Sequence, residues 1–358
     1  MCVCVLVTNT LPKFLWAIII NHSSPMDLRY LVERIGQVVI TIFTVVTLTF
    51  VLIRQMPGGP MTYLRNEFRD RQGFSEADAD RMIELYTNIN PEETLLEAYI
   101  SYMTSILQGD LGRSLWQNEE VATVIAEALP WTVFLMSVSM FLSFGIGITV
   151  GALMAYFEGG KFDISMTGVS VVLTSIPYYV VAIVFIAVFA YNISLFPAGG
   201  RVGDVEAGFS LAYIGSVFHH ATLPILSMVL TGFGGTALSM RGNSIQVLGQ
   251  DYLRVARLRG LPTRTIALRY VGRNAVLPMY TGLMIGIGFM FGGSIILEEI
   301  FQYPGIGYHM FQSVDQRDYM LMMGCFIVIT TAVAVSIFIA DLTYGKIDPR
   351  AGSGGDEG

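Results

Sequence analysis

The chain has 358 residues, of which 53% are hydrophobic and 14% charged, and its formal net charge is −7. A soluble globular domain carries about 25% charged residues, so this composition excludes an ordinary soluble protein and places most of the chain in a lipid bilayer. The three cysteines, Cys2, Cys4 and Cys325, exclude a disulfide framework and offer no metal site. We expect no metal, no cofactor and no nucleic-acid partner.

The first 25 residues precede the predicted membrane protein. Residues 14–20 form an apolar run that follows Lys13, as in a weak signal sequence, but the run is too short to cross a bilayer. The segment that begins at Met26 fits the start of the protein better than Met1 does. We therefore expect residues 1–25 to be an extension without a role of its own, and residues 26–56 to hold the amino-terminal segment and the first membrane helix.

Six apolar stretches are long enough to cross the bilayer as helices, which takes about 20 residues each. None of the six contains Asp, Glu, Lys or Arg, as expected where charge is costly to bury. They comprise residues 35–53, 131–157, 168–196, 221–240, 275–297 and 319–340. The sequence therefore predicts an all-α polytopic membrane protein with six transmembrane helices.

A long acidic segment, residues 57–130, separates the first two predicted spans and is long enough to have its own fold. Residues 75–78 carry a capping signature for one short helix. Residues 90–93, Asn-Pro-Glu-Glu, are predicted to start a second helix that Gly109 closes. Its apolar side chains share one face: Leu95, Tyr99, Tyr102 and Ile106. This segment is either a solvated acidic cap or a docking surface for an external substrate-delivery protein.

The stretch from Arg241 to Pro278 is rich in arginine and lies between apolar runs. One acid, Asp251, accompanies its arginines, which are Arg241, Arg254, Arg257, Arg259, Arg264, Arg269 and Arg273. A first helical stretch is predicted to stop at Gly260, Pro262 follows, and a second helical stretch runs on to Pro278, because glycine and proline end and turn helices. Such a cytoplasmic helix–turn–helix is suited to receive force from a soluble partner.

The distribution of basic residues predicts the topology. Short loops rich in arginine stay in the cytoplasm, which places residues 241–278 inside, together with the amino terminus beside Arg29 and Arg34 and the carboxyl tail with Lys346 and Arg350. The loops after the third and fifth spans, and residues 57–130, then lie outside. The loop after the third span carries Arg201, Asp204 and Glu206. The loop after the fifth span carries Glu298, Glu299, Asp315, Arg317 and Asp318.

The sequence does not carry the motifs of a membrane enzyme, so we expect no catalytic residues. It has no Walker A motif, since Gly160-Lys161 and Gly345-Lys346 are followed by Phe and Ile and lack the earlier glycine. It has no HExxH or GxGD sequence of a membrane protease. An ion-coupled secondary transporter is the stronger alternative, although inverted repeats and charge at the bilayer midplane are not found.

An ordered set of motifs gives the chain a resemblance to a known family. They are GDLGRS (109–114), LPWTVFL (129–135), QDYLRVARLRGL (250–261) with RNAVLP (273–278), LEEIFQYPGIG (297–307), RDYMLMMG (317–324) and ADLTYGKIDPR (340–350). From residue 26 to residue 350 the chain resembles the permease subunit of binding-protein-dependent ABC importers, specifically the B-type permease of dipeptide and oligopeptide systems. It departs from the family pattern at Leu238, where an arginine is common, and at Pro262, which replaces a serine-like cap.

The resemblance implies a type I ABC importer permease fold, with a permease core over residues 131–345 and a cytoplasmic tail over residues 346–358. It also implies an ATPase-coupling loop whose residues are Asp251, Arg254, Val255, Ala256, Arg257, Gly260 and Leu261. Arg254-Val255-Ala256 would take the EAA positions of that loop. Leu253, Val255, Ala256 and Leu258 would give apolar contact to the ATPase, while the arginines pair with acids or stay solvated.

The partners implied by the resemblance are a second permease subunit in a heterodimer, two cytoplasmic ATP-binding subunits, and an extracellular or periplasmic solute-binding protein. ATP-driven closure of the two ATP-binding subunits would swing the spans from inward- to outward-facing. Di- and oligopeptides are the implied cargo. Nickel and oligosaccharides stay open as alternatives, because the external binding protein makes the first selection.

Overall fold

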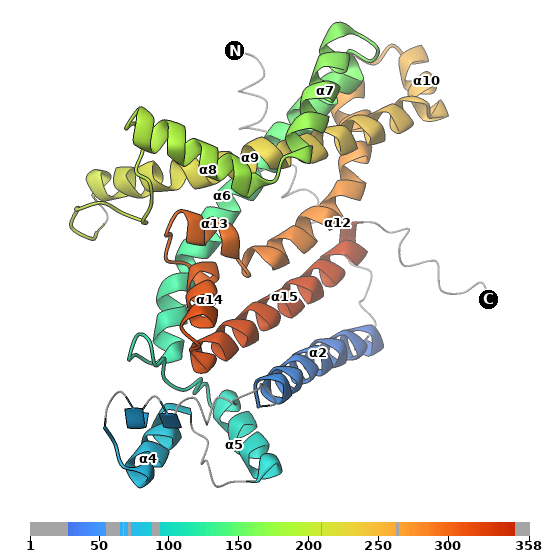
Figure 1. Cartoon of the computed structure of the whole chain (residues 1–358). Helices are drawn as coiled ribbons and strands as arrows, with labels where there is room; N and C mark the ends of the chain where they lie inside the picture. The colour runs from blue at the N-terminus through green and yellow to red at the C-terminus, as the bar shows by residue number, and fades with distance from the viewer. Residues whose placement is uncertain are drawn as a thin grey trace.

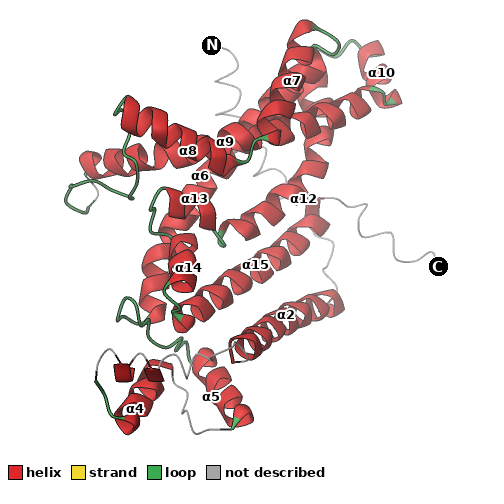
Figure 2. Ribbon diagram, in the orientation of Figure 1, coloured by secondary structure: helices red, strands yellow, loops and turns green. Residues whose placement is uncertain are grey.

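The computed structural model describes residues 28–54, 65–66, 68–70, 73–87, 94–208, 210–262 and 265–347. In this part every regular element is helical (Figure 2), and the one β pairing is an isolated bridge between Arg113 and Glu120. The all-α prediction is confirmed for these ranges. The predicted extension, residues 1–25, and the tail from residue 348 lie outside them.

Four helices are long and apolar enough to cross a membrane, and they form the frame of the molecule (Figure 1). They are α2 (Leu28–Arg54), α6 (Val121–Tyr156), α9 (Leu211–Leu248) and α15 (Tyr319–Ile347). A bent helix pair raises the number of candidate spans to five. The stretch predicted as the fifth span forms α12 (Arg273–Met290) and the turn at Gly292-Gly293 that follows it. Helix α12 is not among the helices that qualify by length and composition. The count of six spans stays a prediction.

The stretch predicted as the third span, residues 168–196, is not one continuous helix. Its halves are α7 (Lys161–Ser175) and α8 (Tyr178–Phe185), which continues into the π-helical segment η1 (Ile186–Asn192), and they are bent by 88°. Pro177 lies at the break, and Ile176 before it has extended backbone angles. Proline disfavours the helical conformation of the preceding residue, so the bend has a local cause.

Helices α6 and α9 form the most extensive helix pair and pack closely where glycines replace side chains. A Cβ atom at Gly147 would lie 2.5 Å from Cβ of Thr236, and one at Gly151 would overlap the carbonyl oxygen of Ala237. Small residues let two membrane helices approach each other to backbone contact. The pair is therefore fixed in register by the absence of these two side chains.

The segment between the first two spans contains both predicted short helices, α4 (Glu76–Thr87) and α5 (Leu95–Leu107). Ser75 accepts a hydrogen bond from the backbone N–H of Asp78 at 3.3 Å, as its capping signature predicts. Helix α5 begins at Leu95, because Thr94 is its N-cap and forms a capping box with Glu97. Those hydrogen bonds from Thr94 hold the pKa of the Glu97 carboxyl below its usual range. The predicted helix start at residues 90–93 lies outside the described residues.

Asp318, one of the acids of the predicted external loop before the last span, is buried rather than exposed to water. Its carboxylate accepts hydrogen bonds from the Ser114 hydroxyl at 2.6 Å, from the backbone N–H of Trp116 at 3.1 Å and from the backbone N–H of Leu321 at 3.1 Å. It therefore caps α15 and ties the GDLGRS motif to the RDYMLMMG motif.

Glu298, in the same predicted loop, is also fully buried. It lies in the short helix α13 (Ile295–Ile300), and its carboxylate accepts hydrogen bonds from the Thr132 hydroxyl at 3.2 Å and from the backbone N–H of Tyr308 at 3.1 Å in α14 (Ile306–Asp315). A Cβ atom at Gly305 would lie 2.5 Å from this carboxylate. The glycines of the LEEIFQYPGIG motif therefore make room for the carboxylate that holds α13 and α14 on α6.

We expect Thr132→Val to destabilise the protein, because the Thr132 hydroxyl serves two buried partners. It donates to Glu298 and accepts the backbone N–H of Ile306 at 2.8 Å. An isosteric valine leaves that N–H unpaired, which costs roughly 1–3 kcal/mol. A lower midpoint of thermal unfolding in detergent would show this loss. Thr149→Val is the matched control in the same helix, since the Thr149 hydroxyl bonds only to its own turn at Gly145, and an equal shift in both variants would contradict the prediction.

Candidate functional site

The predicted helix–turn–helix follows directly from α9. That helix ends at Leu248, and after Gly249 and Gln250 the chain forms α10 (Asp251–Leu258). Asp251 lies in the first turn of α10 and Arg257 in its last turn, which suits the dipole of the helix. The first helical stretch is thus confirmed, as an element separate from the long span before it.

One face of α10 is buried within this chain. Leu253 is 1% exposed and Ala256 3%, and both belong to a small apolar cluster with Ile266 and Val271. Val247, Leu248, Leu261 and Tyr270 pack against this cluster, so it joins α10 to the end of α9 and to the segment after the turn. The expectation that Leu253 and Ala256 give apolar contact to a partner is therefore corrected: the inner face of this amphipathic helix already uses them.

The opposite face of α10 is exposed and combines apolar and basic side chains. Val255 is 52% exposed and Leu258 81%, and Tyr252 lies beside them. The other exposed side chains of the predicted coupling loop are Asp251, Arg254 and Arg257. An aromatic and aliphatic surface with arginines around it is typical of protein interfaces. These residues form the exposed side of α10, and we call them the α10 face.

The turn after α10 has the glycine geometry that the sequence predicts. Gly260 has a φ of +67° and is exposed, and a Cβ atom there would meet nothing within 4 Å. Its N–H bonds to the carbonyl of Arg257 at 2.9 Å, and the N–H of Leu261 bonds to that of Ala256 at 3.3 Å. A positive φ strains any residue with a Cβ, so glycine allows this tight end of the helix.

The second helical stretch reaches Pro278, as predicted, and continues beyond it. The π-helical segment η2 (Ile266–Gly272) continues directly into α12, which passes Pro278 and ends at Met290. The side-chain amide of Asn274 in α12 donates to the Tyr252 hydroxyl at 3.3 Å, and that of Asn243 in α9 donates to the Ala275 carbonyl at 3.0 Å. The turn is therefore fixed to α12 as well as to α9.

An ion pair with a buried carboxylate lies near this site and was not predicted from the sequence. The Arg241 guanidinium in α9 contacts Asp163 in the first turn of α7 through two hydrogen bonds, Nε to Oδ1 at 2.5 Å and a terminal nitrogen to Oδ2 at 2.8 Å. Asp163 is buried and also accepts the N–H of Gly159 at 3.0 Å. Two parallel bonds of this kind fix direction as well as distance. Residues 78 positions apart carry no local signal of such a contact.

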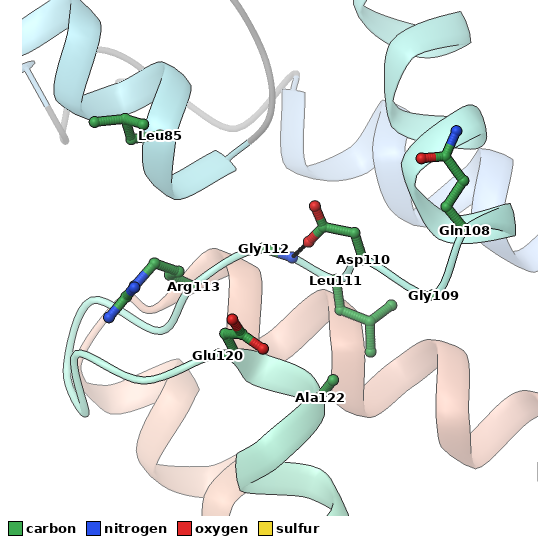
Figure 3. A pocket seen from close by; sticks show the side chains of 9 residues that line it. All are labelled: Leu85, Gln108, Gly109, Asp110, Leu111, Gly112, Arg113, Glu120 and Ala122. Carbon is green, nitrogen blue, oxygen red and sulfur yellow. Dashed lines mark hydrogen bonds between the residues drawn. The ribbon is translucent and has the colours of Figure 1, made fainter.

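The coupling helix α10 and the segment between the first two spans lie at opposite ends of the molecule. Figure 1 shows α10 and the start of α7 at one end, and α4 and α5 at the opposite end. At the latter end a pocket is lined by Leu85 of α4 and by Gln108, Gly109, Asp110, Leu111, Gly112, Arg113, Glu120 and Ala122 (Figure 3). Asp110 in this pocket accepts the N–H of Gly112 at 2.9 Å.

Known proteins resemble this chain in sequence, and a solved structure resembles it in fold. Residues 147–353 match the family model described as "Binding-protein-dependent transport system inner membrane component". The oligopeptide transport system permease protein AppB of Bacillus subtilis is 31% identical over 322 residues, which cover 90% of this chain and 98% of that protein. The dipeptide transport system permease protein DppB of Escherichia coli K12 is 27% identical over 341 residues, which cover 90% of this chain and 98% of that protein.

A solved structure gives the likeness in fold. It is a chain of the MetNI methionine ABC transporter in inward-facing conformations, with a TM-score of 0.50 and 14% identity, and the match covers 63% of this chain and 96% of that chain. At this identity the likeness concerns the fold alone.

Proposed function

Because the chain belongs to the family of binding-protein-dependent transport system inner membrane components, which includes the permease subunits of ABC importers, we propose that it forms the translocation path for dipeptides and oligopeptides. The energy comes from ATP hydrolysed on a separate subunit, since the chain itself lacks a Walker A motif. An external solute-binding protein delivers the peptide.

The observation that carries this proposal is the α10 face. Its exposed residues Tyr252, Val255 and Leu258 lie on a helix whose other side is packed against α9 and η2. A force applied to the exposed face is therefore passed to α9, and through α9 to α6, which packs along it. In the proposed cycle, two ATP-binding subunits press on this face and on that of a second permease subunit, and they drive the change between inward- and outward-facing states.

The proposed coupling residues have different roles. Asp251, Arg254, Val255 and Arg257 are exposed and lie in the contact with the ATP-binding subunit. Ala256 and Leu261 hold the turn in place from inside, because both pack in the apolar cluster of Leu253 and Ile266. Gly260 allows the turn itself. The partner surface of this chain is thus smaller and more basic than the sequence pattern alone implies.

We expect reporters to place the two ends of the molecule on opposite sides of the membrane. A reporter inserted after Gln250 should be cytoplasmic, and one inserted near Gly73 should be external. The arginines of residues 241–278 motivate this orientation, and the position of α10 opposite α4 and α5 supports it (Figure 1). An external signal after Gln250 would overturn the proposed topology, in which both termini are cytoplasmic.

Uptake by the reconstituted transporter tests the function. The chain is placed in proteoliposomes with its companion permease, ATP-binding and solute-binding subunits, and uptake of labelled di- and oligopeptides is measured with ATP and with a non-hydrolysable analogue. We expect uptake only with ATP and with the solute-binding protein present. ATP-driven uptake of nickel or an oligosaccharide in place of peptide would change the proposed substrate but support the proposed ATP-driven mechanism. Uptake driven by an ion gradient alone would establish the secondary-transporter alternative.

A further inference from the structure

Helix α5 (Leu95–Leu107) has a wide apolar face, and only part of this face is packed against the rest of the chain. At 100° per residue, its polar side chains fall on one arc, which comprises Glu97, Ser101, Thr104 and Ser105. The remaining arc is apolar. One half of that apolar arc contains Ala98, Tyr102 and Ile106, and the other half contains Leu96, Ile100 and Leu107.

The first half of the apolar arc is packed against the membrane helices. Ala98 and Tyr102 are buried in the same apolar cluster as Phe50 of α2 and Met320 of α15. The ring centroid of Tyr102 lies 5.4 Å from that of Phe50. The Tyr99 hydroxyl is 2.7 Å from the Thr47 hydroxyl of α2 and shares a hydrogen bond with it. These contacts fix α5 to one end of α2 and set the direction in which its other faces point.

The second half of the apolar arc is not covered by this chain. Leu96 is 66% exposed, Ile100 57% and Leu107 87%, and we call these three the α5 stripe. Helix α2 also exposes large apolar side chains, namely Val32, Ile35, Val39, Ile40, Phe43 and Leu48. The contacts of α5 with Thr47 and Phe50 lie at the carboxyl end of the candidate span Leu31–Val51 in α2, so the α5 stripe lies beside the end of a membrane span.

We propose that α5 is an interfacial helix whose stripe, Leu96, Ile100 and Leu107, lies against the acyl chains of the bilayer while its polar arc faces water. An amphipathic helix of this kind places its apolar face about 5–10 Å into the boundary between headgroups and acyl chains. This inference goes beyond the proposed transport function, because it assigns a lipid contact to a segment between two spans.

The chemistry of the stripe favours lipid over a protein partner. Its three side chains are all aliphatic, whereas the centres of protein–protein interfaces are enriched in aromatic residues and arginine. Tyr99, on the α2 side of the helix, is a residue type typical of the water–membrane boundary. The polar arc carries one acid and no basic residue, so apolar contact rather than attraction to anionic headgroups holds the helix in place.

Spin labels on single cysteines test the proposal in the assembled transporter, reconstituted into phosphatidylethanolamine–phosphatidylglycerol vesicles. Cys2 and Cys4 are replaced by serine, and Cys325 is kept because it is fully buried. Labels are attached at Leu96→Cys, Ile100→Cys and Leu107→Cys, and at Thr104→Cys on the polar arc as the matched control. Collisions with oxygen, which concentrates in acyl chains, are compared with collisions with a water-soluble nickel chelate.

We expect oxygen collisions to dominate at positions 96, 100 and 107, and nickel collisions to dominate at position 104, one turn from Ile100. Nickel-dominated collisions on the stripe would overturn the proposal and make the stripe a water-exposed surface. Low collision rates with both reagents would also overturn it, because a protein would then cover the stripe. If coverage appears only when the solute-binding protein is added, the stripe is a docking surface for that protein. The proposed transport function is tested separately, by the uptake measurement.

Discussion

Replacing Gly260 with leucine is expected to abolish ATP-driven uptake while the protein still inserts into the membrane and accumulates normally. Gly260 has a φ of +67°, which costs a residue with a Cβ roughly 1 kcal/mol or more. That cost is small against the stability of a long helical chain. A Cβ atom at this position meets nothing within 4 Å, so the leucine side chain has room at the exposed turn that follows α10. It therefore obstructs the contact with the ATP-binding subunit before it disturbs the fold.

A second glycine separates backbone strain from obstruction of the surface. Gly73 has a φ of +71°, and a Cβ there also meets nothing within 4 Å, but it lies just before α4 at the opposite end of the molecule. Gly73→Leu introduces the same strain and should retain uptake. Uptake and ATP hydrolysis are measured for both variants, together with copurification of the ATP-binding subunit. Near-normal uptake in Gly260→Leu would mean that this turn is not the coupling element.

Local patterns predicted the features of this molecule that depend on neighbouring residues. The Gly260-Leu261-Pro262 sequence predicted the end of α10 and its positive φ, since few residues other than glycine take that conformation. Ser75 and Asp78 predicted the start of α4. Apolar runs without charge predicted the four long helices, because burial in lipid demands such runs. The family motifs predicted the permease subunit that the relatives support.

Contacts between distant residues were not predictable from the same patterns. Asp318 and Glu298 were counted as charges of an external loop, yet each is buried among backbone N–H groups and a hydroxyl supplied by Ser114 or Thr132. A single sequence does not reveal which hydroxyl meets which carboxylate. The break at Pro177 was not predictable from the proline alone, because other prolines, Pro130 and Pro224, lie inside continuous helices of this chain.

Removing the Arg241 side chain is expected to lower both stability and transport. Arg241→Ala leaves the Asp163 carboxylate buried with the N–H of Gly159 as its nearest remaining donor. Leaving one partner of a fully buried ion pair alone costs about 3–5 kcal/mol, and the cost here is smaller because the Arg241 side chain is 30% exposed. The midpoint of thermal unfolding should therefore fall. Arg65→Ala is the matched control, because the Arg65–Asp80 pair is partly exposed and such a pair contributes only about 0–1 kcal/mol.

The double variant Asp163→Asn with Arg241→Met distinguishes a structural role of this pair from a role in coupling. Removing both charges restores stability, since no buried carboxylate is left without its partner. Arg241 lies between the apolar cluster that holds α10 and the body of α9, and its two bonds to Asp163 fix α7 to that helix. If a push on α10 reaches the bent pair of α7 and α8 through these bonds, the double variant should hydrolyse ATP but transport fewer peptides for each ATP. Full recovery of both stability and the transport ratio would show that the pair only holds the fold.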